Sequence, residues 1–309
     1  MLAPLGAVPL IGWYFSSVLL RPVTSVDAEE LWRHGPDPAA LELPFQEVPV
    51  PGPLGDYPAW LVPAGDSERM TRPATWAIAV HGRGADRREA LRVLPALHRA
   101  GLTTLVITYR NDLGAPASPD GMYHLGATEW ADLAAAVRYA SAHGATRVLL
   151  YGWSMGAAVI GAYLSSPDRA QLPVAGVIWD SPVLDWRATL RQQARVHRIP
   201  GGLSWLVAEA TVVASSIRAG IRFSRFDLPR RPPASRPPTL VIHGAQDSAV
   251  PPGPGRELAE TAEAGRLDWP VRYFEIPGAE HTAGWNVDPT GYQRAVEDFV
   301  AGLTLSAGR

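Results

Sequence analysis

Residues 152–156 read Gly-Trp-Ser-Met-Gly, and they stand between an apolar run and a segment with helical character. Alone, a G-x-S-x-G pentapeptide is a weak signal, because short patterns of this kind also occur by chance. A nucleophile held at a sharp strand-to-helix turn needs a strand, the turn and a helix, with glycines making room for the strained backbone. All three are expected here, so Ser154 is the candidate nucleophile. The alternative is a serine that merely caps the helix.

Apolar runs recur on both sides of this motif, and helical patterns separate most of them. The runs expected to form strands are 45–50, 58–62, 75–80, 102–109, 147–151, 174–179, 239–242 and 271–276. Apolar residues recur at helical spacing over 87–99, 128–142, 155–164, 254–264 and 293–301. This alternation predicts an α/β fold, with a mainly parallel sheet covered by helices on both faces, over residues 44–305.

One stretch interrupts the alternation. Residues 181–238 separate two expected strands where a single helix would suffice. Apolar residues recur at helical spacing from Trp186 to Ala194 and again from Leu203 to Ile217. We expect a small helical cap over about residues 183–236, at the carboxyl ends of the strands, where open α/β sheets bind ligands.

A serine hydroxyl becomes a good nucleophile when a base takes its proton and an acid orients that base. On this type of fold the chain order is serine, acid, histidine, each in a loop after a strand. Asp247 follows the run at 239–242 and His281 follows the next run, so they are the candidate acid and base. His243 comes ahead of the acid. Asp180 is an alternative acid, but Ser181-Pro182 after it favours a turn-capping role.

The negative charge that develops on a substrate carbonyl needs two backbone N–H donors. The N–H of Met155, directly after the nucleophile, is expected to be one. The N–H of Arg83, in the loop His81-Gly82-Arg83-Gly84, is expected to be the other. Trp153 and Trp285 are candidate pocket residues. No cluster of metal-ligating side chains is apparent in the sequence, and we expect no metal.

The apolar N-terminal segment, residues 1–22, stands apart from this domain. Met1–Leu20 carry no charged side chain, and a run of this length approaches what a bilayer-spanning helix needs. Pro4 and Pro9 weaken any helix that begins earlier. We favour a helix over 9–20 that docks on its own domain or on a partner subunit. A membrane anchor remains the alternative, so the sequence leaves cytoplasmic and membrane-associated locations open.

Composition excludes several classes of function. The net charge of −2 argues against a basic field that would attract nucleic acid or anionic lipid. The chain has no cysteine, which excludes disulfides, thiolate catalysis and cysteine–zinc sites. No sequence pattern indicates the oligomeric state.

Four stretches together resemble the α/β-hydrolase superfamily, most of all its small prolyl-oligopeptidase-like esterases and lipases. They are H-G-R-G at 81–84, G-W-S-M-G at 152–156, H-G-A-Q-D at 243–247 and G-A-E-H at 278–281. The resemblance extends over about 47–303, and one departure is Ala157, where many relatives have glycine.

This resemblance implies an eight-stranded core sheet and carboxylic-ester hydrolysis through an acyl-enzyme, with a small-molecule substrate and no metal or organic cofactor. The small cap favours short to medium acyl chains. Two alternatives remain. An amide or peptide hydrolase would use the same three residues, although the peptidase relatives carry a large accessory domain. A non-catalytic, hydrolase-like binding protein would usually lack one of the three.

Overall fold

The computed structural model describes residues 8–23, 35–65, 74–199 and 201–306. Its strands are β1 (Gln46–Gly52), β2 (Gly55–Val62), β3 (Thr75–Val80), β4 (Thr103–Ile107), β5 (Arg147–Trp153), β6 (Val174–Asp180), β7 (Thr239–Gly244) and β8 (Val271–Ile276). They form one sheet in the order β1-β2-β4-β3-β5-β6-β7-β8. Neighbours from β4 to β8 pair in parallel, whereas β2 is antiparallel to β1 and β4. The predicted eight-stranded, mainly parallel sheet is confirmed.

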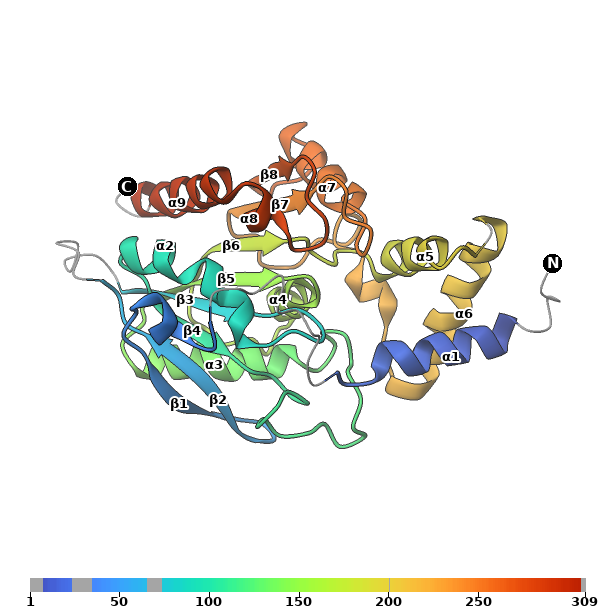
Figure 1. The fold of residues 1–309 in the computed structure, drawn as a ribbon, viewed down its shortest axis with the longest axis horizontal. Coiled ribbons are helices and arrows are strands. Elements are labelled where there is room, and N and C mark those ends of the chain that lie inside the picture. The colour runs from blue at the N-terminus through green and yellow to red at the C-terminus, as the bar shows by residue number, and fades with distance from the viewer. Residues whose placement is uncertain (1–7, 24–34, 66–73, 200, 307–309) are drawn as a thin grey trace.

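Helices cover both faces of this sheet (Figure 1). On one face, α3 (Trp130–Ala142) and α4 (Met155–Ser165) pack on the central strands. On the other lie α2 (Leu94–Arg99) and α9 (Pro289–Ser306). Two further helices, α7 (Gly253–Glu263) and α8 (Gly284–Val287), follow β7 and β8. Because both faces are covered, the central strands are mostly apolar and almost completely buried.

Two local differences from the sequence-based expectation have simple causes. The helix expected over 87–99 is divided into a 3-10 helix, Arg87–Arg92, and α2, because Pro95 lacks the N–H that a continuous helix would use. The first hairpin is tighter than expected. Its strands run on to Gly52 and Gly55, and Gly55 has a φ of +138° that a side chain would disfavour.

The region expected to form a helical cap, residues 183–236, contains α5 (Trp186–Val196), α6 (Gly201–Ala219) and a 3-10 helix at Phe223–Phe226. The N-terminal helix α1 (Val8–Leu20) packs against α6, and the two helices lie with α5 at one end of the molecule (Figure 1). A Cβ at Gly12 would overlap Ala210, and the Ser215 hydroxyl donates to Ser16 Oγ at 3.0 Å. Small residues thus bring α1 and α6 into close contact.

The favoured placement of the N-terminal segment, a helix docked on its own chain, is the arrangement that α1 adopts. Residues 1–7 of this segment lie outside the described residues. Within the described ranges, no helix has both the length and the apolar character to cross a bilayer.

Candidate active site

Ser154 stands at the turn between β5 and α4, with φ 49° and ψ −114°. This backbone conformation is unfavourable for a residue with a side chain, and the surrounding structure must hold it. Two glycines make the turn possible. A Cβ at Gly156 would overlap the Val80 carbonyl oxygen, and one at Gly152 would lie 2.8 Å from the carbonyl carbon of Gly156. The Ser154 N–H also donates to the Asp180 carbonyl at 2.9 Å. The turn therefore lifts the serine side chain clear of the sheet.

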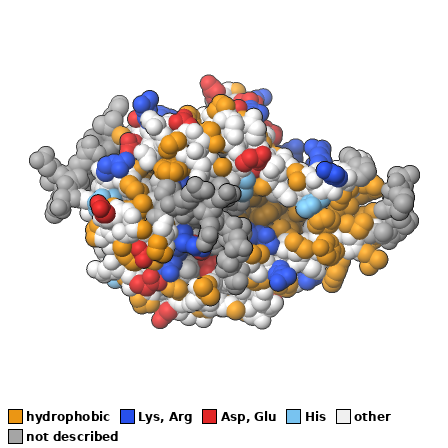
Figure 2. All heavy atoms as spheres, in the orientation of Figure 1, with side chains coloured by type: hydrophobic (Ala, Val, Ile, Leu, Met, Phe, Trp, Pro, Cys, Tyr) orange, Lys and Arg blue, Asp and Glu red, His pale blue; other side chains and the backbone are white. Residues whose placement is uncertain are grey.

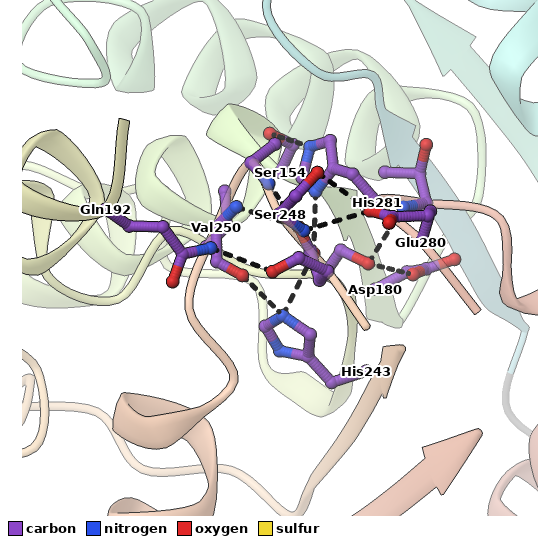
Figure 3. A network of polar contacts seen from close by, with 12 residues as sticks. Ser154, Asp180, Gln192, His243, Ser248, Val250, Glu280 and His281 are labelled. Atoms are coloured by element: carbon purple, nitrogen blue, oxygen red, sulfur yellow. Dashed lines mark hydrogen bonds and ion pairs between the residues drawn. The ribbon is translucent and has the colours of Figure 1, made fainter. Parts of the chain in front are cut away.

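The loops after β7 and β8 bring an acid, Asp247, and a histidine, His281, to this serine. Figure 3 shows Ser154 and His281 within this network of polar contacts. His281 Nε2 lies 2.9 Å from Ser154 Oγ, and His281 Nδ1 lies 2.8 Å from Asp247 Oδ2. Because Nδ1 faces a carboxylate, it carries the ring proton and leaves the Nε2 lone pair to accept the serine hydroxyl. This arrangement can remove the proton from Ser154 as the oxygen attacks.

Asp247 is buried, yet it is held as a carboxylate. Burial by itself raises the pKa of this group, but hydrogen bonds from His243 and His281 outweigh burial and leave the pKa well below its usual range. The N–H groups of Ala249 and Val250 donate to the other carboxylate oxygen at 2.9 and 2.8 Å. The acid is therefore negatively charged and oriented before any substrate binds.

Sequence reasoning missed several residues that position this acid. His243 Nε2 lies 3.1 Å from the same oxygen that His281 contacts, so His243 supports the acid although it stands too early to be the base. Gln192, on α5, donates to the Asp247 carbonyl at 2.8 Å. Ser248 Oγ and N–H both donate to Glu280, which joins the acid loop to the histidine loop. The H-G-A-Q-D and G-A-E-H stretches contained His243 and Glu280 without indicating these roles, and nothing in the sequence marked Gln192.

Asp180, the alternative acid, has different partners. Its carboxylate accepts hydrogen bonds from Tyr292 at 2.7 Å and from Ser181 at 3.0 Å. Among the hydrogen bonds of the described residues, it is Asp247 and not Asp180 that contacts His281. Asp180 instead ties β6 to α9.

The loop after β3 is held by a buried network. The Gly82 carbonyl accepts from His81 Nδ1 at 2.9 Å and from the Tyr109 hydroxyl at 3.0 Å. In a trans peptide the next N–H points opposite to this carbonyl, so the network directs the N–H of Arg83 away from Tyr109. The loop also runs close to the serine, since a Cβ at Gly82 would lie 3.1 Å from Ser154 Cβ. The loop thus holds the Gly82–Arg83 peptide in one orientation beside the serine.

The histidine of this network is positively charged at neutral pH. His81 Nε2 lies 2.8 Å from Asp112 Oδ2, while Nδ1 faces a carbonyl, so both ring nitrogens donate. Burial lowers the pKa of His81, but the charge and hydrogen bond of Asp112 outweigh it and raise the pKa to about 9. This imidazolium contributes stability in full below its usual pKa of about 6.5 and loses it as the pH rises through about 9.

We therefore expect the free energy of unfolding to fall between pH 6.5 and 9, by a few kcal/mol at most. Urea unfolding across this range would measure it, with His81→Gln as the comparison, because glutamine can donate but cannot titrate. The difference in stability between the two proteins should shrink as the pH rises. Parallel profiles would contradict a charged His81.

The Arg83 side chain has a role that the sequence did not suggest. Its guanidinium donates to the carbonyls of Val18, Leu19 and Arg21, at the C-terminal end of α1. Cations favour this end of a helix, because its carbonyls lack partners within the helix. Arg83 therefore holds α1 over the site.

A cavity of about 310 Å³ opens beside Ser154 and His281. Its apolar wall comes from three helices: Phe15, Val18 and Leu19 of α1, Trp186 and Leu190 of α5, and Val207 and Ala208 of α6. The two predicted pocket tryptophans are not brought to this wall. Trp153 is fully buried and stacks on Tyr151 in the core on the far side of the sheet, because alternate residues of β5 point to opposite faces. Trp285, on α8, packs against that same core cluster.

Within the described ranges, no group of three or more His, Asp or Glu side chains is placed to hold a metal ion.

The sequence model of the prolyl oligopeptidase family matches residues 97–304, which is more than half of the chain and includes Ser154, Asp247 and His281. The chain belongs to the prolyl oligopeptidase family. As a member of this family it is an α/β serine hydrolase, and the predicted resemblance is confirmed.

Solved structures share the fold of this family member at low sequence identity. An esterase from Pyrococcus furiosus superposes with a TM-score of 0.69 at 19% identity, covering 93% of this chain and 98% of its own. An α/β serine hydrolase without a lid from Xanthomonas campestris gives a TM-score of 0.54 at 19% identity, covering 84% and 95%. No curated protein sequence matches the chain.

Proposed function

We propose that this hydrolase cleaves carboxylic esters of short to medium acyl chains, using Ser154 as nucleophile, His281 as base and Asp247 as the acid that orients the base. One observation carries the proposal. Ser154 Oγ, His281 and Asp247 form a continuous hydrogen-bonded series at a strained strand-to-helix turn. The fold it shares with an esterase is consistent with this choice of substrate.

The reaction has two halves. Ser154 Oγ attacks the ester carbonyl while His281 Nε2 takes its proton, and the resulting imidazolium then protonates the departing alcohol. A water molecule then attacks the acyl-enzyme while the same nitrogen takes its proton. That proton passes to Ser154 Oγ as its bond to the acyl group breaks, which releases the carboxylic acid and restores the enzyme. Asp247 stays ionised throughout and stabilises the imidazolium in both halves.

The N–H groups of Met155 and Arg83 are the proposed donors to the oxyanion. Met155 is the first residue of α4, where backbone N–H groups have no partner within the helix. The Gly82–Arg83 peptide is held by His81 and Tyr109, so its donor needs no reorientation when charge develops.

The size of the cavity limits the acyl group. At about 310 Å³ it lies at the lower end of the range for ligand pockets. We expect the para-nitrophenyl esters of acetate, butyrate and octanoate to give a higher kcat/KM than the palmitate ester. A chromogenic panel graded by acyl length measures this, and a palmitate ester as best substrate would contradict it. The corresponding para-nitroanilides in the same assay test amide cleavage.

A further inference from the structure

The end of the molecule formed by α1 and α6 exposes an unusual number of large apolar side chains. We call this surface the cap face: Leu10, Trp13, Tyr14 and Val18 of α1, and Trp205, Val213 and Ile217 of α6, each between 49% and 75% exposed. Figure 2 shows hydrophobic side chains gathered over this end of the molecule. Large exposed apolar patches of this kind mark interaction sites.

The sequence of α1 explains why this face is apolar. The helix contains no charged side chain, and its small residues Gly12 and Ser16 face α6. Leu20 packs into the core, whereas Phe15 and Leu19 line the cavity and Leu10, Trp13 and Tyr14 are exposed. A helix that only covers a soluble domain would present polar residues outward.

Charge is distributed unevenly along the chain, and the net charge of −2 conceals this. Residues 183–236 contain ten arginines and three acidic residues, a net charge of +7. The expectation that the chain has no basic field is therefore wrong for the cap. It was based on the net charge of the whole chain, in which the acidic residues outside 183–236 outweigh the arginines of the cap.

Several of these arginines border the cap face. The Arg218 guanidinium lies 5.0 Å from the ring centre of Trp13 and donates to Ser17 at 2.7 Å. Arg195 and Arg198 are exposed at the end of α5, beside His197, whose ring lies 5.9 Å from that of Phe15. An apolar centre with Trp and Tyr, bordered by arginine, is the composition of surfaces that lie in a lipid interface.

We propose that the cap face docks on a lipid surface that carries anionic headgroups. The apolar residues enter the boundary between headgroups and acyl chains, and the bordering arginines face the phosphates. A second copy of the chain is a poorer occupant, because it would bring two caps of charge +7 together.

This placement gives α1 two functions at once. Phe15 and Leu19 line the cavity beside Ser154, whereas Leu10 and Tyr14 of the same helix face outward. Val18 does both, since it lines the cavity and is 49% exposed. This consequence rests on the proposed ester hydrolysis. Docking brings the mouth of the cavity to the lipid, so that an ester dissolved in the lipid enters the cavity without crossing water.

The test is flotation of the full-length protein with vesicles of phosphatidylcholine, with and without phosphatidylglycerol. We expect binding to the anionic vesicles that weakens as salt is raised. Leu10→Gln together with Ile217→Gln should weaken it about tenfold or more, because both side chains lose their apolar contact. Arg195→Gln together with Arg198→Gln should weaken it about tenfold on anionic vesicles alone.

Two controls make the result specific. Leu113→Gln removes an equally exposed leucine, 80% exposed, in a loop beside β2, and should bind as the unchanged protein does. Ser154→Ala should also bind normally, so a loss of ester hydrolysis and a loss of docking can be told apart. Absence of binding to anionic vesicles would overturn the proposal. Equal binding to both kinds of vesicle would also overturn it. So would a stable dimer in sedimentation experiments that dissociates when Leu10→Gln and Ile217→Gln are introduced together.

Discussion

Replacing Ser154 with alanine is expected to lower kcat for ester hydrolysis by roughly 10⁴- to 10⁶-fold. Without the hydroxyl no acyl-enzyme forms, and the remaining rate comes only from the oxyanion donors and substrate binding. A fluorophosphonate should label the unchanged protein at Ser154 and fail to label the variant, as mass spectrometry of the labelled peptide would show. The same measurement separates the enzyme from a hydrolase-like binding protein.

Other serines near the site serve as references. Ser181 donates to Asp180, and Ser248 donates to Glu280. Among the described residues neither hydroxyl has a hydrogen bond to a histidine nitrogen, so neither is activated as Ser154 is. Label on Ser181 or Ser248 would refute the assignment. Ser224→Ala, which changes an exposed serine outside the site, should leave labelling and turnover unchanged.

Asp247→Asn should lower kcat by at least a hundredfold and by up to about four orders of magnitude. An amide nitrogen that faces His281 Nδ1 favours the other tautomer of the imidazole ring, with the proton on Nε2. In that tautomer Nε2 cannot accept the hydrogen bond from the serine hydroxyl. The substitution keeps the volume of the side chain. Steady-state kinetics with a short-chain ester, together with circular dichroism to confirm folding, measure the effect.

Asp180→Asn is the matched control, because it makes the same chemical change in an equally buried acid. Its partners are Tyr292 and Ser181 rather than the histidine. We expect it to reduce stability by about 1–3 kcal/mol through weaker buried hydrogen bonds, and to change kcat only a few-fold. The reverse pattern in the two variants would make Asp180 the acid.

Much of the fold was predictable because its signals are local. Apolar runs such as 75–80 and 147–151 predicted strands, since a strand covered on both faces must be apolar along its length. The residues at which helices and strands begin and end were less predictable. The division of the helix expected over 87–99 depended on Pro95, and the extension of the first hairpin to Gly55 depended on cross-strand pairing.

Part of the candidate site was predictable from the sequence and part was not. Ser154, Asp247 and His281 each follow a strand, and the carboxyl ends of parallel strands lie along one edge of the sheet, so chain order alone predicted that they meet. Trp153 was misplaced, because whether a side chain of β5 faces the cavity depends on its place in the alternation along the strand. Trp153 lies on the opposite face. Trp285 was misplaced as well, since it lies on α8 and packs against a core cluster instead of lining the cavity.

By itself, the sequence determined the α/β fold, the strained turn at Ser154 and the order of the three candidate catalytic residues. These depend on residue types and spacings within short segments. Only the tertiary structure decided that His243 and Gln192 support the acid and that Arg83 caps α1. It also decided that α1 forms both a wall of the cavity and an exposed apolar face. These features join segments far apart in the chain, and only the packing of the folded molecule brings such segments together.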